Sequence, residues 1–256
     1  MDEIVEGRNP VLELLKAGRP VNKVLLANDA ERHGVIAQIL YLARRANVPV
    51  EYVDKRVIDQ RSSTGHAQGV LVYTSAKEYV GLEDLLQISR RRKEPPLYVI
   101  LDGIEDPHNL GAVLRTADAT GVHGVIIPTR RAVGLTAAVA RASAGAVEYV
   151  AVARVTNITQ TIKQLAKEQV WVVGIDMDGK QEYTGVDYKL PTAIVIGAEG
   201  EGLSRLVKES CDSLVSIPMK GKVGSLNASV AAAVVMYETL RQRRPPVAVE
   251  QKAKAR

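Results

Sequence analysis

The chain has 256 residues, of which 46% are hydrophobic and 25% are charged, a composition typical of a folded globular protein and not of a disordered one. The single cysteine, Cys211, excludes a disulfide framework, and the four scattered histidines argue against a zinc site. No apolar run approaches the roughly 20 residues that a membrane span needs, and no secretory signal is evident. We therefore expect a cytoplasmic protein without a membrane partner.

The net charge of +5 is spread over the chain. Basic residues gather in short clusters instead: Arg90–Lys93, Arg130-Arg131, Lys220 with Lys222, and Arg241–Arg244. Such clusters can follow the phosphates of a nucleic acid, but they can equally form an ordinary solvated surface. Charge alone leaves both interpretations open.

Residues 1–75 are predicted to form a small α/β unit, because apolar residues alternate between helical spacing and short continuous runs. The predicted elements are helix Pro10–Lys16, strand Lys23–Ala27, helix Gly34–Arg45, strand Val48–Val53, helix Val57–Arg61 and strand Gly69–Tyr73. Residues 76–96 are polar and end in Pro95-Pro96, which cannot continue a helix. A linker is predicted there, with 86–96 as its mobile part.

Residues 97–244 show apolar strands alternating with helices, which predicts an α/β fold with a mostly parallel sheet covered on both faces. The predicted strands are Leu97–Leu101, Val122–Ile127, Tyr149–Val152, Trp171–Ile175, Ala193–Ile196 and Leu214–Ile217. The predicted helices are Asn109–Thr120, Leu135–Ser143, Thr156–Gln169, Leu203–Glu209 and Ser225–Arg244. Residues 245–256 are predicted to be a disordered basic tail.

The first segment that does not look like scaffold leaves the strand Leu97–Leu101 and turns through Pro107 into a helix. Asn109 is a natural N-cap for that helix, and Arg115 follows in its second turn. Both side chains can face the crevice at the carboxyl end of the strand, where open α/β sheets bind ligands. A plain cap and a surface arginine are the alternative.

The second segment holds three glycines within six positions, in the pattern G-x-E-G-x-G from Gly197 to Gly202. This is not the dinucleotide pattern G-x-G-x-x-G, and the acidic residue expected about 20 positions further on is missing. Glu199 and Glu201 would repel a pyrophosphate, so a ligand with a positive centre, such as a sulfonium, fits better. A tight turn between a strand and a helix is the alternative.

The third segment is a loop rich in glycine and lysine that leads into a helix carrying Ser225, Asn227 and Ser229 near its start. Ser225 does not lie in a G-x-S-x-G elbow, because Val223 and Asn227 stand at the glycine positions. No histidine is close in the sequence, so a serine hydrolase is disfavoured.

In this order and spacing, the three segments resemble the SpoU (TrmH-like) branch of the SPOUT methyltransferases over about residues 97–244. The family keeps an Asn followed six residues later by an Arg, as in Asn109 and Arg115. It also keeps a strand ending in G-x-E-x-x-G, as in Gly197–Gly202, and S-L-N-x-S-x-A, as in Ser225–Ala231. The opening Glu6–Val11 looks like that of the RlmB-type members, whose small α/β domain is akin to the kink-turn-binding ribosomal proteins.

The resemblance implies a SPOUT fold with a deep C-terminal trefoil knot, a homodimer through the knotted domain and no metal. It implies methyl transfer from S-adenosylmethionine to a ribose 2′-hydroxyl of RNA, guanosine-2251 in the P-site loop of 23S rRNA for an RlmB-type member. A tRNA or another rRNA site is an alternative substrate, and a non-catalytic ribosome assembly factor is an alternative function. The N-terminal unit could also be a protein-interaction module.

The resemblance also assigns roles to individual residues. The implied cofactor-binding residues are Gly197, Gly202, Ile217, Met219, Ser225 and Leu226. The implied catalytic residues are Arg115, Asn109, Glu199, Ser225 and Asn227, and the implied RNA contacts are Arg8, Asn9, Arg115, Lys220 and Lys222. Because an arginine stays protonated, it is a poor general base, and we favour an orienting and charge-stabilising role for Arg115.

Overall fold

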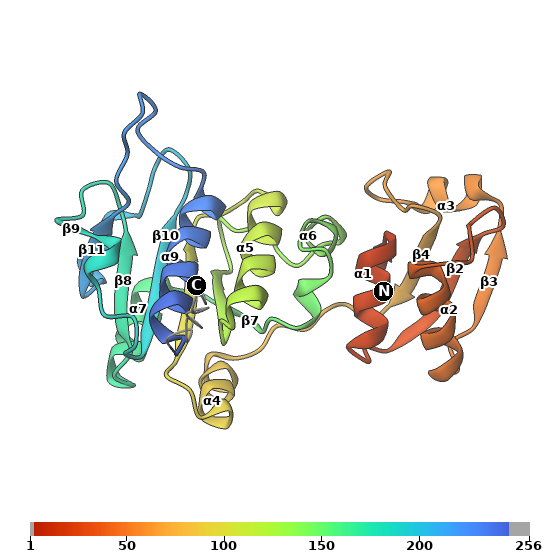
Figure 1. The fold of residues 1–256 in the computed structure, drawn as a ribbon, viewed down its shortest axis with the longest axis horizontal. Helices are drawn as coiled ribbons and strands as arrows, with labels where there is room; N and C mark the ends of the chain where they lie inside the picture. Colours follow the sequence, from red (N-terminus) through yellow and green to blue (C-terminus); the bar gives the residue numbers. More distant parts are fainter. Residues whose placement is uncertain (1–2, 246–256) are drawn as a thin grey trace, which may run out of the picture.

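The computed structural model describes residues 3–245, which form two α/β units that lie side by side (Figure 1). The predicted disordered tail, 245–256, lies outside the described residues except for Pro245.

The first unit is a four-stranded sheet with helices on both faces. Its elements are β1 (Glu3–Glu6), α1 (Arg8–Lys16), β2 (Val21–Ala27), α2 (Val35–Arg45), β3 (Val50–Val53), α3 (Lys55–Arg61) and β4 (Val70–Thr74). The strand order is β1-β4-β2-β3, and only β2 and β3 are parallel. Val24 packs with α1 and α2, while its neighbour Leu25 packs with α3, because successive side chains of a strand point to opposite faces. The sequence prediction missed β1, a short strand with a glutamate at each end.

Helix α4 (Leu82–Arg92) occupies most of the predicted linker. Leu85 and Leu86 are buried against the sheet of the second unit, and the Ser89 hydroxyl lies 3.0 Å from the Tyr98 hydroxyl. A Cβ added to Gly124 would lie 2.6 Å from Leu85, so the helix packs closely on the strand. The stretch 86–92 is therefore helical and packed, not extended and mobile as predicted. The basic residues that suggested a linker form the exposed face of this helix, and the two leucines form its buried face.

The second unit is built on a seven-stranded sheet. Its strands are β5 (Leu97–Asp102), β6 (Gly124–Pro128), β7 (Val152–Val155), β8 (Trp171–Ile175), β9 (Gln181–Glu182), β10 (Thr192–Gly197) and β11 (Ser213–Ser216). Its helices are α5 (Pro107–Thr120), α6 (Ala137–Ala142), α7 (Ile158–Lys167), α8 (Arg205–Ser210) and α9 (Ala228–Arg243), with 3₁₀ turns η1 (Ala146–Glu148) and η2 (Tyr183–Gly185).

All paired strands of this sheet are parallel, in the order β7-β6-β5-β10-β8-β11-β9, which confirms the predicted α/β class. Val99 and Leu101 of β5 pack toward α5 and α9, whereas Tyr98 and Ile100 pack toward α4 and α7. Both faces of the sheet are therefore covered, as continuous apolar strands require.

The predicted strand Tyr149–Val152 is wrong except for its last residue. The 3₁₀ turn η1 ends at Glu148, and the backbone amides of Tyr149 and Val150 still bond to the carbonyl of Ala146. Strand β7 begins only at Val152. Apolar residues in this stretch are buried by a turn, which periodicity alone does not distinguish from a short strand.

The strand order brings the three motif segments together. Strand β10 lies between β5 and β8, and β11 lies on the far side of β8. Helix α9 follows β11 in the chain but packs against α5 and β10. The carboxyl ends of β5, β10 and β11 therefore meet at one edge of the sheet, where ligands bind in open α/β folds.

Candidate active site

The turn after β10 requires glycine at three of its positions. The chain doubles back so that the amide of Ala198 bonds to the carbonyl of Gly202 at 3.1 Å, and the amide of Gly202 bonds to the carbonyl of Ala198 at 2.9 Å. A Cβ on Gly197 would lie 2.1 Å from the carbonyl carbon of Gly202. Gly200 has a φ of 79° and Gly202 one of 68°, which side-chain-bearing residues rarely adopt. Steric and conformational requirements therefore explain the glycines.

This turn forms one wall of a pocket whose other walls come from the end of β8 and the loop between β11 and α9. Its apolar lining includes Ile175, Ile196, Ile217, Met219 and Leu226. Its acidic lining includes Asp176, Asp178, Glu199 and Glu201. The pocket therefore offers apolar surface for a flat ring and negative groups for a cationic ligand.

A polar network joins the three motifs beside this pocket. Asn109 donates its side-chain amide to Glu199 Oε1 at 2.9 Å, and Asn227 Nδ2 donates to Asn109 Oδ1 at 2.9 Å. Asn227 Nδ2 also contacts Glu199 Oε1, and the backbone amide of Ala228 lies 3.4 Å from the same oxygen. One carboxylate oxygen of Glu199 thus accepts from the starts of α5 and α9, which fixes the glycine turn relative to these two helix starts.

The N-cap of α5 is Asp106 and not Asn109 as predicted. Asn109 is not the N-cap of α5, because Pro107 takes the first helical position and the carboxylate of Asp106 accepts from the amide of His108 at 2.9 Å. Asn109 instead lies within the first turn, buried, with its amide free to reach Glu199. Asn227 is the N-cap of α9 and accepts from the amides of Ser229 and Val230.

The structure gathers the predicted cofactor-binding residues around one pocket. Gly197, Gly202, Ile217, Met219, Ser225 and Leu226 all line it. Lys220 and Lys222 are exposed on the loop between β11 and α9 that carries part of this lining. Arg115 is not brought there. It is exposed on α5, outside the pocket lining, and no ion pair or hydrogen bond holds it within residues 3–245.

The two predicted RNA contacts of the first unit lie at the start of α1. The backbone amide of Arg8 donates to Gln68 Oε1 at 3.1 Å, and the side-chain Nε of Arg8 lies 3.4 Å from the Gln68 carbonyl oxygen. Asn9 is exposed. These bonds attach the start of α1 to the loop that precedes β4.

Asp176 and Lys208 were missed by the sequence analysis, although both line the pocket. Their side chains form an ion pair at 2.8 Å, with Asp176 only 5% exposed. Burial would raise the pKa of Asp176, but hydrogen bonds from Lys208 and from the amides of Asp178 and Leu203 outweigh it and hold that pKa below its ordinary value. The position of Asp176, directly after a buried parallel strand, was the signal that could have found it.

The residues present suit S-adenosylmethionine. Apolar and acidic side chains line the same pocket, a combination suited to an adenine ring and a methionine part with a positive sulfonium. Among the described residues, no three His, Cys, Asp or Glu side chains come together as a metal site.

Comparison with known proteins decides the family. The profile of the SpoU rRNA methylase family matches residues 96–237, and a profile described as RNA 2′-O ribose methyltransferase substrate binding matches residues 4–80. The chain belongs to the SpoU rRNA methylase family. It is therefore an RNA methyltransferase, and its cofactor is S-adenosylmethionine.

Individual relatives span nearly the whole chain. YacO of Bacillus subtilis, assigned to the TrmH family of tRNA/rRNA methyltransferases, is 46% identical over 95% of this chain and 97% of its own. The SpoU methyltransferase AviRb of Streptomyces viridochromogenes, solved with AdoMet, superimposes with a TM-score of 0.79 at 27% identity, over 94% of this chain and 90% of its own. An AdoMet-bound rRNA methyltransferase from Sinorhizobium meliloti superimposes with a TM-score of 0.75 at 25% identity, over 95% and 88%. Within residues 3–245, no helix has the length and apolarity to cross a bilayer.

Proposed function

We propose that this SpoU family protein methylates a ribose 2′-hydroxyl of 23S rRNA, with guanosine-2251 in the P-site loop as the first candidate. The observation that carries the proposal is the junction of Asn109, Glu199 and Asn227 beside the cofactor pocket. The match of residues 4–80 to a 2′-O ribose methyltransferase substrate-binding profile supports a ribose acceptor. An enzyme of this kind acts in the cytoplasm, where ribosomes are assembled.

When bound, S-adenosylmethionine supplies a methyl group activated by its positive sulfur. Ile217 and Leu226 would hold the cofactor through apolar contacts, and the backbone around Gly197 would complete the pocket wall. The amides of Asn109 and Asn227 are locked by Glu199, so they present fixed polar groups to a ribose at the pocket edge. Alignment of the hydroxyl with the methyl group accounts for much of the acceleration.

Arg115, Ser225 and the two loop lysines complete the site in this proposal. Ser225 lines the pocket and can hold the ribose by its hydroxyl. Arg115 has no partner among the described residues, so its planar guanidinium is available to bind a substrate phosphate with two parallel hydrogen bonds. Lys220 and Lys222 add positive charge beside the pocket.

The first unit is proposed to read the RNA through Arg8, Asn9 and the loop before β4. This loop and the loops after β10 and β11 all project toward the same side of the molecule, the top of the view in Figure 1. One RNA can therefore contact both units without wrapping around the protein.

We further propose a homodimer through the second unit and a knotted C-terminal segment. Helix α9 exposes Tyr237 by 53% and Val230 by 46%, which suits a partner surface. Helix α9 returns from the β11 edge to α5 and β10, and this return supports the proposal of a knotted C-terminal segment. Light scattering of the purified protein tests the dimer.

The decisive experiment is transfer of labelled methyl from S-adenosylmethionine to naked 23S rRNA, 16S rRNA and tRNA, with the modified nucleotide mapped. Methylation of 23S rRNA at a single ribose supports the proposal. Methylation of tRNA or 16S rRNA alone replaces the substrate, and methylation of a base overturns the 2′-hydroxyl assignment.

A further inference from the structure

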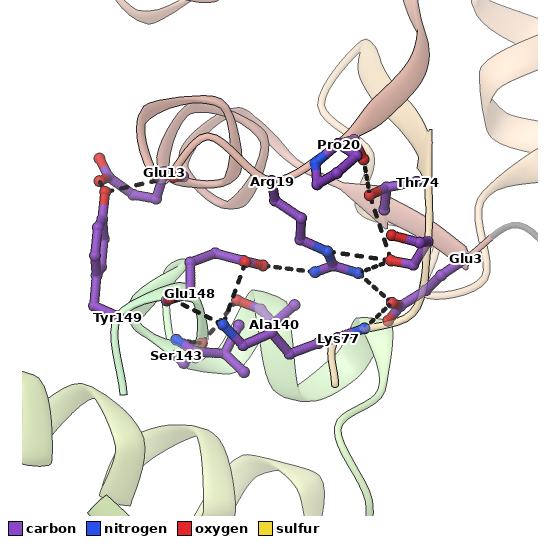
Figure 2. Close-up of polar contacts among 12 residues, drawn as sticks. Glu3, Glu13, Arg19, Pro20, Thr74, Lys77, Ala140, Ser143, Glu148 and Tyr149 are labelled. Atoms are coloured by element: carbon purple, nitrogen blue, oxygen red, sulfur yellow. Dashed lines mark hydrogen bonds and ion pairs between the residues drawn. The ribbon is translucent and has the colours of Figure 1, made fainter. Parts of the chain in front are cut away.

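The two units are held together by a cluster of four charged side chains. Glu148 of η1 enters the first unit, where its Oε1 accepts from Arg19 Nη1 at 2.8 Å (Figure 2). Lys77, which follows β4, donates its Nζ to the Glu148 carbonyl at 3.0 Å and lies 3.9 Å from its Oε2. Glu3 closes the cluster, because its Oε2 accepts from Arg19 Nη2 at 2.5 Å and from the amide of Lys77 at 3.1 Å.

The two central charges are withdrawn from water, and the four charges of the cluster are balanced. The side chain of Glu148 is 2% exposed and that of Arg19 is 9% exposed. Two carboxylates face two cations, so the cluster has no excess charge. Removing one member leaves a buried charge without its partner, which is far more costly than losing a surface ion pair.

Further contacts beside the cluster point to the same rigid junction. Tyr149 Oη donates to Glu13 Oε2 at 2.6 Å, and Gly145 approaches α1 so closely that an added Cβ would lie 2.6 Å from the Cβ of Glu13. Strand β1 lies against α6, and Val5 and Val147 belong to one continuous apolar core. The first unit is therefore docked on the second over several elements, although the sequence suggested a flexible tether.

We propose that Glu148 and Arg19 are positioning residues that determine which nucleotide is methylated, by holding the RNA-reading surface of the first unit at a constant distance from the cofactor pocket. This inference rests on the proposed function. A fixed distance between two contact points on one RNA selects a nucleotide by geometry, whereas a loose tether lets the pocket reach several.

The structural part of the test measures the distance between the units. Spin labels are attached to the full chain at Tyr41→Cys and Gln164→Cys, two exposed positions on α2 and α7. Burial raises the pKa of the Cys211 thiol to about 12, so this half-buried cysteine reacts with the label more slowly than the two exposed ones. The labelled chain is mixed with an excess of unlabelled chain, so that only the two labels of one subunit lie near each other. The native chain is then expected to show one narrow distance distribution. Glu148→Ala is expected to broaden it, and Glu51→Ala, which removes an exposed carboxylate paired with Lys23, is expected to leave it unchanged.

The functional part uses the same variants without labels. Glu148→Ala and Arg19→Ala are each expected to raise the KM for RNA by about tenfold, to spread methyl groups to neighbouring nucleotides and to leave S-adenosylmethionine affinity unchanged. Glu148→Gln, which keeps a hydrogen-bond acceptor, is expected to recover part of the loss. The double variant leaves Glu3 and Lys77 balanced, so its KM is expected to rise by less than the two single effects combined.

Two results overturn the inference: an unchanged distance distribution in Glu148→Ala, or a broadened one with the native KM and the native methylation site. Loss of stability alone would not move the methylated nucleotide, which separates positioning from folding. If the native protein methylates no RNA at all, the proposed function fails, and the label distances still decide whether this cluster fixes the two units.

Discussion

The carboxylate of Glu199 and the side-chain amide of Asn109, 90 positions apart in the chain, are joined by a 2.9 Å hydrogen bond beside the cofactor pocket. Asn227 and the amide of Ala228 approach the same carboxylate oxygen. The glycine turn, the start of α5 and the start of α9 are thus connected through one side chain. Two of these three segments also line the pocket, so the network couples the pocket walls to the start of α5.

Glu199→Gln tests this network. The substitution keeps the size of the side chain but removes the charge that strengthens its hydrogen bonds from Asn109 and Asn227. We expect a folded protein whose methyl transfer falls by roughly tenfold to a hundredfold, measured as single-turnover rates on the mapped RNA. Glu209→Gln is the matched control, because Glu209 is exposed on α8, lies outside the pocket lining and pairs with Arg205. A Glu199→Gln rate equal to that of the control would remove Glu199 from the site.

Arg115→Ala tests whether an arginine outside the pocket lining contributes to methyl transfer. Because Arg115 is exposed and without an ion pair in the described chain, its loss should leave folding and S-adenosylmethionine binding intact. Methyl transfer is expected to fall by roughly a hundredfold, as when a transition-state donor is lost. Arg115→Lys should recover little, because an ammonium cannot form two parallel hydrogen bonds to a phosphate. Arg205→Ala, at an exposed position on α8, serves as control. Activity of Arg115→Ala within a few fold of the native rate would exclude a catalytic role.

Asp176→Asn probes the ion pair with Lys208 through its pH dependence. The folded-state pKa of Asp176 lies below its ordinary value, so the pair stabilises the protein above about pH 4, and this contribution is lost as the pH falls through the folded-state pKa. At pH 7 we expect the variant to lose about 1–2 kcal/mol, or about 2–6 °C in Tm. The difference from the native protein should shrink in acid. A Tm difference that stays constant from pH 7 to pH 3 would contradict this assignment, and Asp178→Asn, at an 84% exposed side chain, should change little.

Leu85→Ala tests whether α4 belongs to the second unit. Leu85 is fully buried against the sheet, so we expect a loss of about 2–4 kcal/mol in the free energy of unfolding, measured with urea. Leu206→Ala removes the same atoms from a residue that is 55% exposed and should cost far less. If the two variants are equally stable, the segment is a linker as the sequence suggested.

The α/β class, the parallel sheet and most elements could be predicted, because apolar periodicity reports local geometry. The chemistry-bearing segments were also recognisable, since a tight turn and helix starts demand particular residue types at fixed spacing. The errors arose where contacts between distant parts of the chain decide the local structure. Residues 76–96 were predicted to be a linker because the sequence does not show that Leu85 packs against Gly124. Asn109 was predicted to be a helix N-cap because only the folded chain shows that Glu199 lies within hydrogen-bond distance of its side-chain amide.

By itself, the sequence determined which residues form the three motif segments and the order of most strands and helices. Only the tertiary structure decided which of those residues meet. Parallel pairing places β10 between β5 and β8, so that Asn109, Glu199 and Asn227 converge, while Arg115 is exposed on α5 outside the pocket lining. It also buried Glu148 against Arg19 and so joined two units that appear separate in the sequence. Such contacts depend on long-range packing and desolvation, for which no local pattern of residues provides a signal.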